Sequence, residues 1–252
     1  MEINKSKRLL NPQFYSGVQP KKQIIWHHTA GMTADGAITW WNQTPDRVGT
    51  AYVIDRDGTI YEVFDPKTWA YHLGVYAKDG GDPHDLDEKQ SIGIELVSAG
   101  QLYPDGTGKM VQYPLYPNKA AKNVPNQAEI WDMGEAGWKG HRYFHSYTDK
   151  QVDSLIALTK HLAKEFKINI QKDLTKFWEF NTEVIKHKPE GLYSHSTVRK
   201  DKADIIPYPP FLEKVYNAFN EKPKFTDTPK ITDKVIKPNA ISSPTKTTKT
   251  NK

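Results

Sequence analysis

Residues 23–31 read Gln23-Ile24-Ile25-Trp26-His27-His28-Thr29-Ala30-Gly31, an apolar run that ends in two histidines and a turn of small residues. The apolar half is typical of a buried strand, and the small residues predict a loop at its end. Imidazole is the commonest protein ligand for transition metals, and a histidine at the end of a buried strand is held rigidly. The stretch therefore predicts a strand that delivers one metal ligand, with the other ligands supplied from elsewhere in the chain.

The chain contains no cysteine among its 252 residues. This excludes disulfides, thiolate zinc sites and cysteine nucleophiles, so any metal must be held by histidine and carboxylate side chains. The length suits one main domain with additions.

The first ten residues are polar and basic, and no apolar stretch of about 7 to 15 residues follows them, so we expect no secretory signal. No window approaches the ~20 apolar residues of a membrane span. We therefore expect a cytoplasmic protein without a membrane span.

The net charge of +5 is concentrated at the C-terminus. Residues 221–252 hold eight lysines and three acidic residues, which leaves 27 basic and 27 acidic residues in 1–220. A neutral body with a basic tail is not typical of a nucleic-acid groove, so no nucleic-acid partner is expected. The tail is rich in Lys, Thr, Pro and Ser and is interpreted as disordered or linker-like, and residues 1–19 as a loose basic leader.

Local patterns predict the main elements. Asp57-Gly58 between two β-rich runs is a strong hairpin signal, and Thr148 with Gln151 forms a capping box before an apolar face at helical spacing. We expect strands at 23–26, 48–55, 59–64 and 91–97, helices at 33–42 (capped by Thr33 or Asp35), 148–166 and 211–219, and a short helix or extended arm at 174–184.

The remaining segments predict loops and an insertion. Residues 78–89 are rich in Asp and Gly and are expected to be exposed. Residues 100–147 are irregular but rich in aromatic side chains, which favours a long ordered insertion over disorder. The histidines outside the candidate site are expected at the surface: His84, His141, His145, His161 and His187.

Three separated segments offer His27, His195 and Asp204, two imidazoles and one carboxylate. Three protein ligands with one open position are typical of a catalytic zinc. Glu95 lies in an otherwise apolar strand, where an isolated carboxylate is costly, and it is a candidate base or a buried ion-pair partner.

Five blocks in this order resemble the type 2 N-acetylmuramoyl-L-alanine amidases, a family that includes phage lysins and the peptidoglycan recognition proteins. The blocks are Ile25-Trp26-His27-His28-Thr29-Ala30-Gly31, residues 52–61, Tyr71-His72-Leu73-Gly74, Ser91-Ile92-Gly93-Ile94-Glu95-Leu96-Val97 and residues 195–204. The resemblance covers about residues 20–100 and 148–220. It implies an α/β fold, a mixed central β-sheet flanked by helices, in one amidase domain at 20–220 with 100–147 as an insertion.

The resemblance also implies roles for individual residues. His27, His195 and Asp204 would bind Zn²⁺, Glu95 would be the general base, and Lys202 would stabilise the oxyanion. His72 would lie in the substrate groove.

Two departures from the family pattern affect these roles. The loop from His195 is one residue shorter than the common form and reads Lys202-Ala203-Asp204, so Asp201 is a rival third ligand. Thr50 and Ala51 stand where some members carry a catalytic tyrosine, which leaves Glu95 as the base. Thr50 is taken as a substrate contact, and His28 as a substrate contact or a support for His27.

The implied reaction is hydrolysis of the amide between the lactyl group of N-acetylmuramic acid and L-alanine of the stem peptide. The absence of a signal favours a phage or prophage endolysin, a monomer that stays in the cytoplasm until lysis and then degrades the cell wall. The alternatives are a cytoplasmic amidase that recycles muropeptides and a peptidoglycan-binding module without activity. The basic tail either attracts an anionic wall surface or serves only as a linker.

Overall fold

A five-stranded mixed sheet forms the centre of the computed structural model, which describes residues 1–75, 81–112, 125–170, 173–174 and 176–219. The strands are β1 (Gln23–His28), β2 (Tyr52–Ile54), β3 (Ile60–Glu62), β4 (Ser91–Leu96) and β9 (Gly191–Ser194), in the order β3-β2-β4-β1-β9. Strand β1 runs parallel to both β4 and β9, and β2 runs parallel to β4. Only β3 is antiparallel to its neighbour, through the hairpin expected at Asp57-Gly58. The mixed sheet of the prediction is confirmed.

Both faces of β1 are covered, as is usual for a central parallel strand. Ile24, Ile25 and Trp26 have no exposed surface. Successive side chains of a strand point to opposite faces, so Ile24 and Trp26 enter the main core while Ile25 joins a smaller cluster on the other face. His27 therefore shares the face of Ile25, and His28 shares the face of Trp26.

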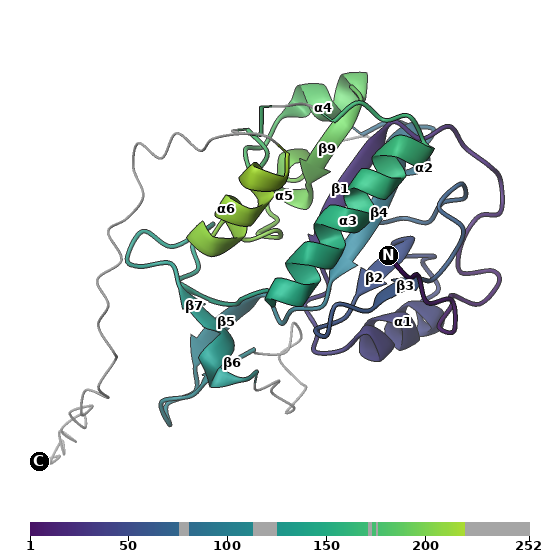
Figure 1. The fold of residues 1–252 in the computed structure, drawn as a ribbon. Helices are drawn as coiled ribbons and strands as arrows, with labels where there is room; N and C mark the ends of the chain where they lie inside the picture. Colours follow the sequence, from purple (N-terminus) through teal and green to yellow (C-terminus); the bar gives the residue numbers. More distant parts are fainter. Residues whose placement is uncertain (76–80, 113–124, 171–172, 175, 220–252) are drawn as a thin grey trace, which may run out of the picture.

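Two helices, α3 (Asp149–Glu165) and α6 (Pro209–Ala218), pack over the main core (Figure 1). The capping box of Thr148 and Gln151 is present, and Val152, Leu155 and Leu158 bury the apolar face of α3. The indole of Trp26 donates a hydrogen bond to Thr159 of α3 at 3.0 Å.

The shorter helices are α1 (Ala34–Gln43), α2 (Leu86–Lys89), α4 (Thr182–His187) and α5 (His195–Val198). Thr33 caps α1 through its side chain, one of the two caps expected. Val184 and Ile185 of α4 and Val198 of α5 cover the face of the sheet that carries Ile25.

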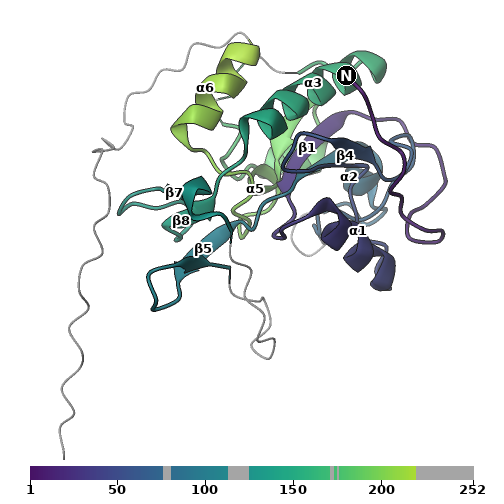
Figure 2. The same ribbon diagram turned by 60° about the horizontal axis from the view of Figure 1, so that its bottom comes forward.

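The insertion forms a second, antiparallel sheet of order β6-β5-β8-β7, set to one side of the central sheet (Figures 1 and 2). Its strands are β5 (Gln101–Pro104), β6 (Met110–Val111), β7 (Ile130–Asp132) and β8 (Tyr143–His145), with a 3-10 helix at Gln127–Glu129. The expectation of ordered structure is confirmed for its described residues. His145 was expected at the surface, but its ring is buried between the amide of Ala99 and the carboxylate of Glu129.

The N-terminal leader is not loose. Asn4 exchanges backbone hydrogen bonds with Ile60 and Glu62 of β3, and Leu9 is buried in the main core. Tyr15 stacks on Trp69 with ring centroids 4.0 Å apart. The leader covers an edge strand that would otherwise present unpaired backbone groups.

Two other expectations need comment. Within 78–89, α2 buries the side chains of Asp87 and Glu88, so the described part of that segment is not simply an exposed loop. The basic tail lies outside the described residues. Among the described helices, none has the length and apolar character needed to cross a bilayer.

Candidate active site

The candidate site lies where the parallel strands end. In the register of the sheet, His27 of β1 stands opposite Glu95 of β4, and Trp26 stands opposite Ser194 of β9. His195 follows Ser194 directly and begins α5. The crevice at the carboxyl ends of parallel strands is the usual place for a ligand in such sheets.

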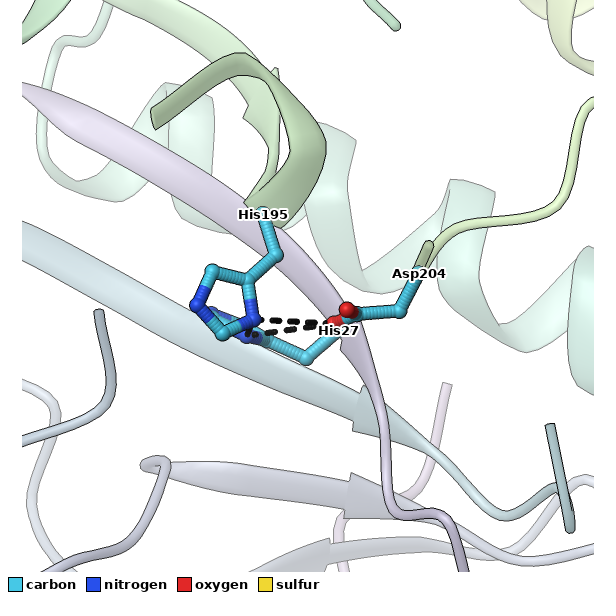
Figure 3. A group of neighbouring side chains, drawn as sticks. All are labelled: His27, His195 and Asp204. Atoms are coloured by element: carbon cyan, nitrogen blue, oxygen red, sulfur yellow. Dashed lines mark hydrogen bonds and ion pairs between the residues drawn. The ribbon is translucent and has the colours of Figure 1, made fainter. Parts of the chain in front are cut away.

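His27, His195 and Asp204 converge at this end of the sheet, one from β1, one from the start of α5 and one from the loop that follows it (Figure 3). The Nδ1 atoms of the two histidines are 2.9 Å apart, and Asp204 Oδ2 lies 3.0 Å from that of His195 and 3.6 Å from that of His27. Donors bound tetrahedrally at about 2.0–2.1 Å from zinc lie about 3.3 Å from one another. The separations in the cluster bracket this value, and all three side chains are buried.

The outer nitrogens of both histidines are hydrogen-bonded, which settles their tautomers. His195 Nε2 lies 2.9 Å from the carbonyl oxygen of Leu73, which can only accept, so this nitrogen carries the proton. His27 Nε2 lies 3.0 Å from His72 Nδ1, and His72 Nε2 lies 2.8 Å from Ser91 Oγ. The Ser91 hydroxyl donates its proton to the carbonyl of Asp87, so its oxygen accepts from His72 Nε2–H. His72 Nδ1 is then unprotonated and accepts from His27 Nε2–H.

Both Nδ1 atoms therefore direct lone pairs at each other and at a carboxylate oxygen. Three acceptors this close require a positive charge between them. Burial, together with the neighbouring His195, lowers the pKa of His27 to about 4, so a second proton on His27 does not supply this charge at neutral pH. The donor set suits a divalent metal held by two nitrogens and one oxygen.

Glu95 lies beside this cluster. Its Oε2 atom is buried and has no hydrogen-bond partner among the residues that the structure describes. Burial and the charge of Asp204 raise the pKa of Glu95 well above its usual range, while Lys202 opposes the rise. A carboxylate with a raised pKa and a free oxygen is suited to take up a proton during a reaction.

Comparison with known proteins gives the family. A family model described as N-acetylmuramoyl-L-alanine amidase matches residues 17–207 of the chain. The chain belongs to this amidase family. No curated protein matches it.

Several solved structures are similar to the amidase at low sequence identity. They include PlyL, with 15% identity and a TM-score of 0.45, where the match covers 87% of this chain and 94% of that one. The N-acetylmuramoyl-L-alanine amidase LysC from Clostridium intestinale has 15% identity and a TM-score of 0.40 and covers 88% and 99%. The hydrolase AmiA from Staphylococcus aureus has 12% identity and a TM-score of 0.48 and covers 87% and 82%. The family assignment rests on the family model.

The loop after α5 carries both candidates for the third metal ligand, Asp201 and Asp204, and places them in different surroundings. Asp201 is exposed and pairs with the guanidinium of Arg199 through two contacts, at 3.0 and 2.6 Å. Only Asp204 joins the histidine cluster. Lys202 is partly buried, and its charge lowers the pKa of His27 as well as that of Glu95.

The structure places the three expected substrate contacts behind the site. The His72 side chain is 4% exposed and is bonded to His27, so it supports that ring. Thr50 is 1% exposed and donates its hydroxyl to the carbonyl of Tyr52. His28 points to the opposite face of β1, where Nδ1 lies 3.0 Å from the hydroxyl of Tyr147. All three side chains are buried and hydrogen-bonded within the protein, and their contact with substrate stays a prediction.

Sequence reasoning missed several supporting groups of the amidase. The carbonyl of Leu73 and the hydroxyl of Ser91 orient the histidines, and Trp138 of the insertion donates its indole N–H to the carbonyl of Ala203 at 2.9 Å. Ala203 lies between Lys202 and Asp204, so the insertion supports the loop that carries both. Nothing local in the sequence marks these groups, because each contact joins segments distant in the chain.

Proposed function

We propose that the amidase is zinc-dependent and hydrolyses the amide between N-acetylmuramic acid and L-alanine, with His27, His195 and Asp204 as the zinc ligands. The proposal rests on the convergence of three buried acceptor atoms, the Nδ1 atoms of two histidines and one carboxylate oxygen. Each histidine carries its proton on Nε2, which is hydrogen-bonded to another group. Zinc bound there would acidify a water molecule and polarise the amide carbonyl.

Glu95 would then transfer the proton, and Lys202 would stabilise the negative charge of the intermediate. Glu95 takes a proton from the attacking water and returns it to the nitrogen of L-alanine as the C–N bond breaks. The ammonium of Lys202 stabilises the negative charge that develops on the carbonyl oxygen. His72 and the carbonyl of Leu73 keep the imidazoles of His27 and His195 in the tautomers that face the site.

Metal analysis tests the ligands. Wild-type protein should hold one zinc per chain, and His195→Ala should lose it. His187→Ala is the matched control, since this histidine is exposed on α4 and pairs with Glu183. Full zinc occupancy in His195→Ala would contradict the assignment.

Turnover tests the base. Glu95→Gln should retain zinc and lose activity by about 10²- to 10⁴-fold, because proton transfer by a positioned group contributes that much. Glu62→Gln is the control, since Glu62 is a buried glutamate on the edge strand β3 of the same sheet. A fully active Glu95→Gln would remove Glu95 from the mechanism. A wild-type protein that binds peptidoglycan without hydrolysing it would instead favour the peptidoglycan-binding module.

We further propose that the amidase acts as a phage or prophage endolysin on the intact cell wall. Release of new amino termini should be faster from intact walls than from soluble muropeptides. Faster release from the soluble fragments would favour the recycling amidase instead.

A further inference from the structure

Glu88, on the short helix α2, is a buried carboxylate that the proposed reaction does not use. Its oxygens accept hydrogen bonds from three consecutive backbone N–H groups. Oε2 accepts from His72 at 2.8 Å and from Leu73 at 3.0 Å, and Oε1 accepts from Leu73 at 3.1 Å and from Gly74 at 3.0 Å. We call residues 72–74 the clamped segment.

The clamped segment supplies the outer partners of both histidines in the cluster. The Nδ1 atom of His72 accepts a hydrogen bond from His27 Nε2–H, and the carbonyl of Leu73 accepts one from His195 Nε2–H. The two contacts lie on adjacent residues, so one displacement of this backbone would disturb both imidazoles. The carboxylate of Glu88 accepts hydrogen bonds from all three backbone N–H groups of the clamped segment.

We propose that Glu88 is a positioning residue for the metal site, one that sets the tautomer and direction of His27 and His195 through the clamped segment. This inference rests on the proposed zinc site. Groups that orient metal-bound histidines typically change metal affinity or activity by about 10- to 100-fold when they are removed. Glu88 acts one contact further out, but on both histidines together.

The clamp needs a carboxylate. Both oxygens of Glu88 accept from backbone N–H groups, in the four contacts observed. A glutamine of the same shape keeps one oxygen and turns an NH₂ group toward a backbone N–H. Donor then faces donor, and the backbone must move to avoid it.

Asp87 provides a matched control on the same helix. It is as buried as Glu88, at 3% exposure, but its carboxylate faces Lys188 at 3.3 Å and the N–H of Asp82 at 2.9 Å. Asp87→Asn therefore removes a buried charge from α2 without touching the clamped segment.

The experiment uses the full chain and compares wild type, Glu88→Gln, Glu88→Asp and Asp87→Asn. Affinity for Zn²⁺ is measured by competition with a chelator, and the protonated nitrogen of each imidazole is read from ¹⁵N chemical shifts of the metal-free protein. Glu88→Gln should weaken zinc binding by about 10- to 100-fold and shift the tautomers of His27 and His195. Asp87→Asn should keep both properties even if it melts at a lower temperature.

Glu88→Asp keeps the charge and serves if Glu88→Gln does not fold; its shorter side chain should give a smaller change in the same direction. A folded Glu88→Gln or Glu88→Asp with wild-type zinc affinity and wild-type imidazole shifts would overturn the proposal. If wild type itself binds no zinc, the proposed function fails, and the imidazole shifts alone then decide the role of Glu88.

Discussion

Gly93 is a position at which one added methyl group should be costly. It lies on β4 between Ser91 and Glu95, on the face that carries the site. A Cβ at this position would lie 2.6 Å from Thr50 Cγ2 and 3.0 Å from His72 Nδ1. The glycine is therefore needed for space, because the ring of His72 passes over it to reach His27.

The size of the effect follows from these distances. Carbon atoms pack best at about 3.5–4.0 Å, so the methyl of Thr50 would have to retreat by about 1 Å. Thr50 is buried and its hydroxyl is bonded to Tyr52, which leaves little room for that movement. Overpacking of this kind typically costs about 1–3 kcal/mol, so Gly93→Ala should lower the free energy of unfolding by that amount. Displacement of His72 should also weaken zinc binding.

Urea denaturation of the metal-free protein measures the cost, with Gly17→Ala as the control because the nearest atom to its added Cβ is 3.6 Å away. Thr50→Ser removes the crowded methyl group, so Gly93→Ala with Thr50→Ser should recover part of the loss, and a double-mutant cycle gives the coupling. A Gly93→Ala protein as stable as wild type would refute the close-packing argument.

Three further predictions concern other parts of the fold. Burial lowers the pKa of His145 to about 4. The imidazole is therefore protonated near pH 6.5 in the unfolded chain but only near pH 4 in the folded protein, so the free energy of unfolding falls as the pH drops from about 6.5 to 4. His145→Asn should remove about 2 kcal/mol of the loss between pH 7 and pH 5, measured by denaturation at both values. Trp138→Phe removes the hydrogen bond to Ala203, and should lower the free energy of unfolding by about 1 kcal/mol and slow turnover of cell walls. Thr148→Ala removes the capping box of α3 and should cost about 0.5–2 kcal/mol in a thermal melt, with zinc affinity unchanged.

The elements predicted best were those with strong local signals. The apolar run before His27, the Asp57-Gly58 turn and the capping box at Thr148 each specify a backbone conformation through neighbouring residues. The packed leader and the buried part of α2 were missed. Their burial depends on which side chains of other segments cover them, and no pattern within them records this.

At the candidate site, the types of residue could be predicted from the sequence, but the placement of their side chains could not. The types of residue needed for a metal and a base were visible, and the family resemblance implied His27 and not His28 as the ligand, but the choice between Asp204 and Asp201 remained open. The two-residue period of β1 turns only His27 toward the site, and Arg199 holds Asp201 away from it. Both outcomes depend on neighbours brought in by the fold.

The sequence by itself determined the strand of residues 23–26, the order of the family's blocks and the absence of thiol ligands, because these depend on local pattern and residue type. Only the tertiary structure decided which atoms face the site. Parallel pairing of β1 with β4 sets His27 beside Glu95, and the clamped segment, held by Glu88, orients the two histidines. Hydrogen bonds between segments far apart in the chain direct each ring nitrogen, and such contacts exist only after the backbone has folded.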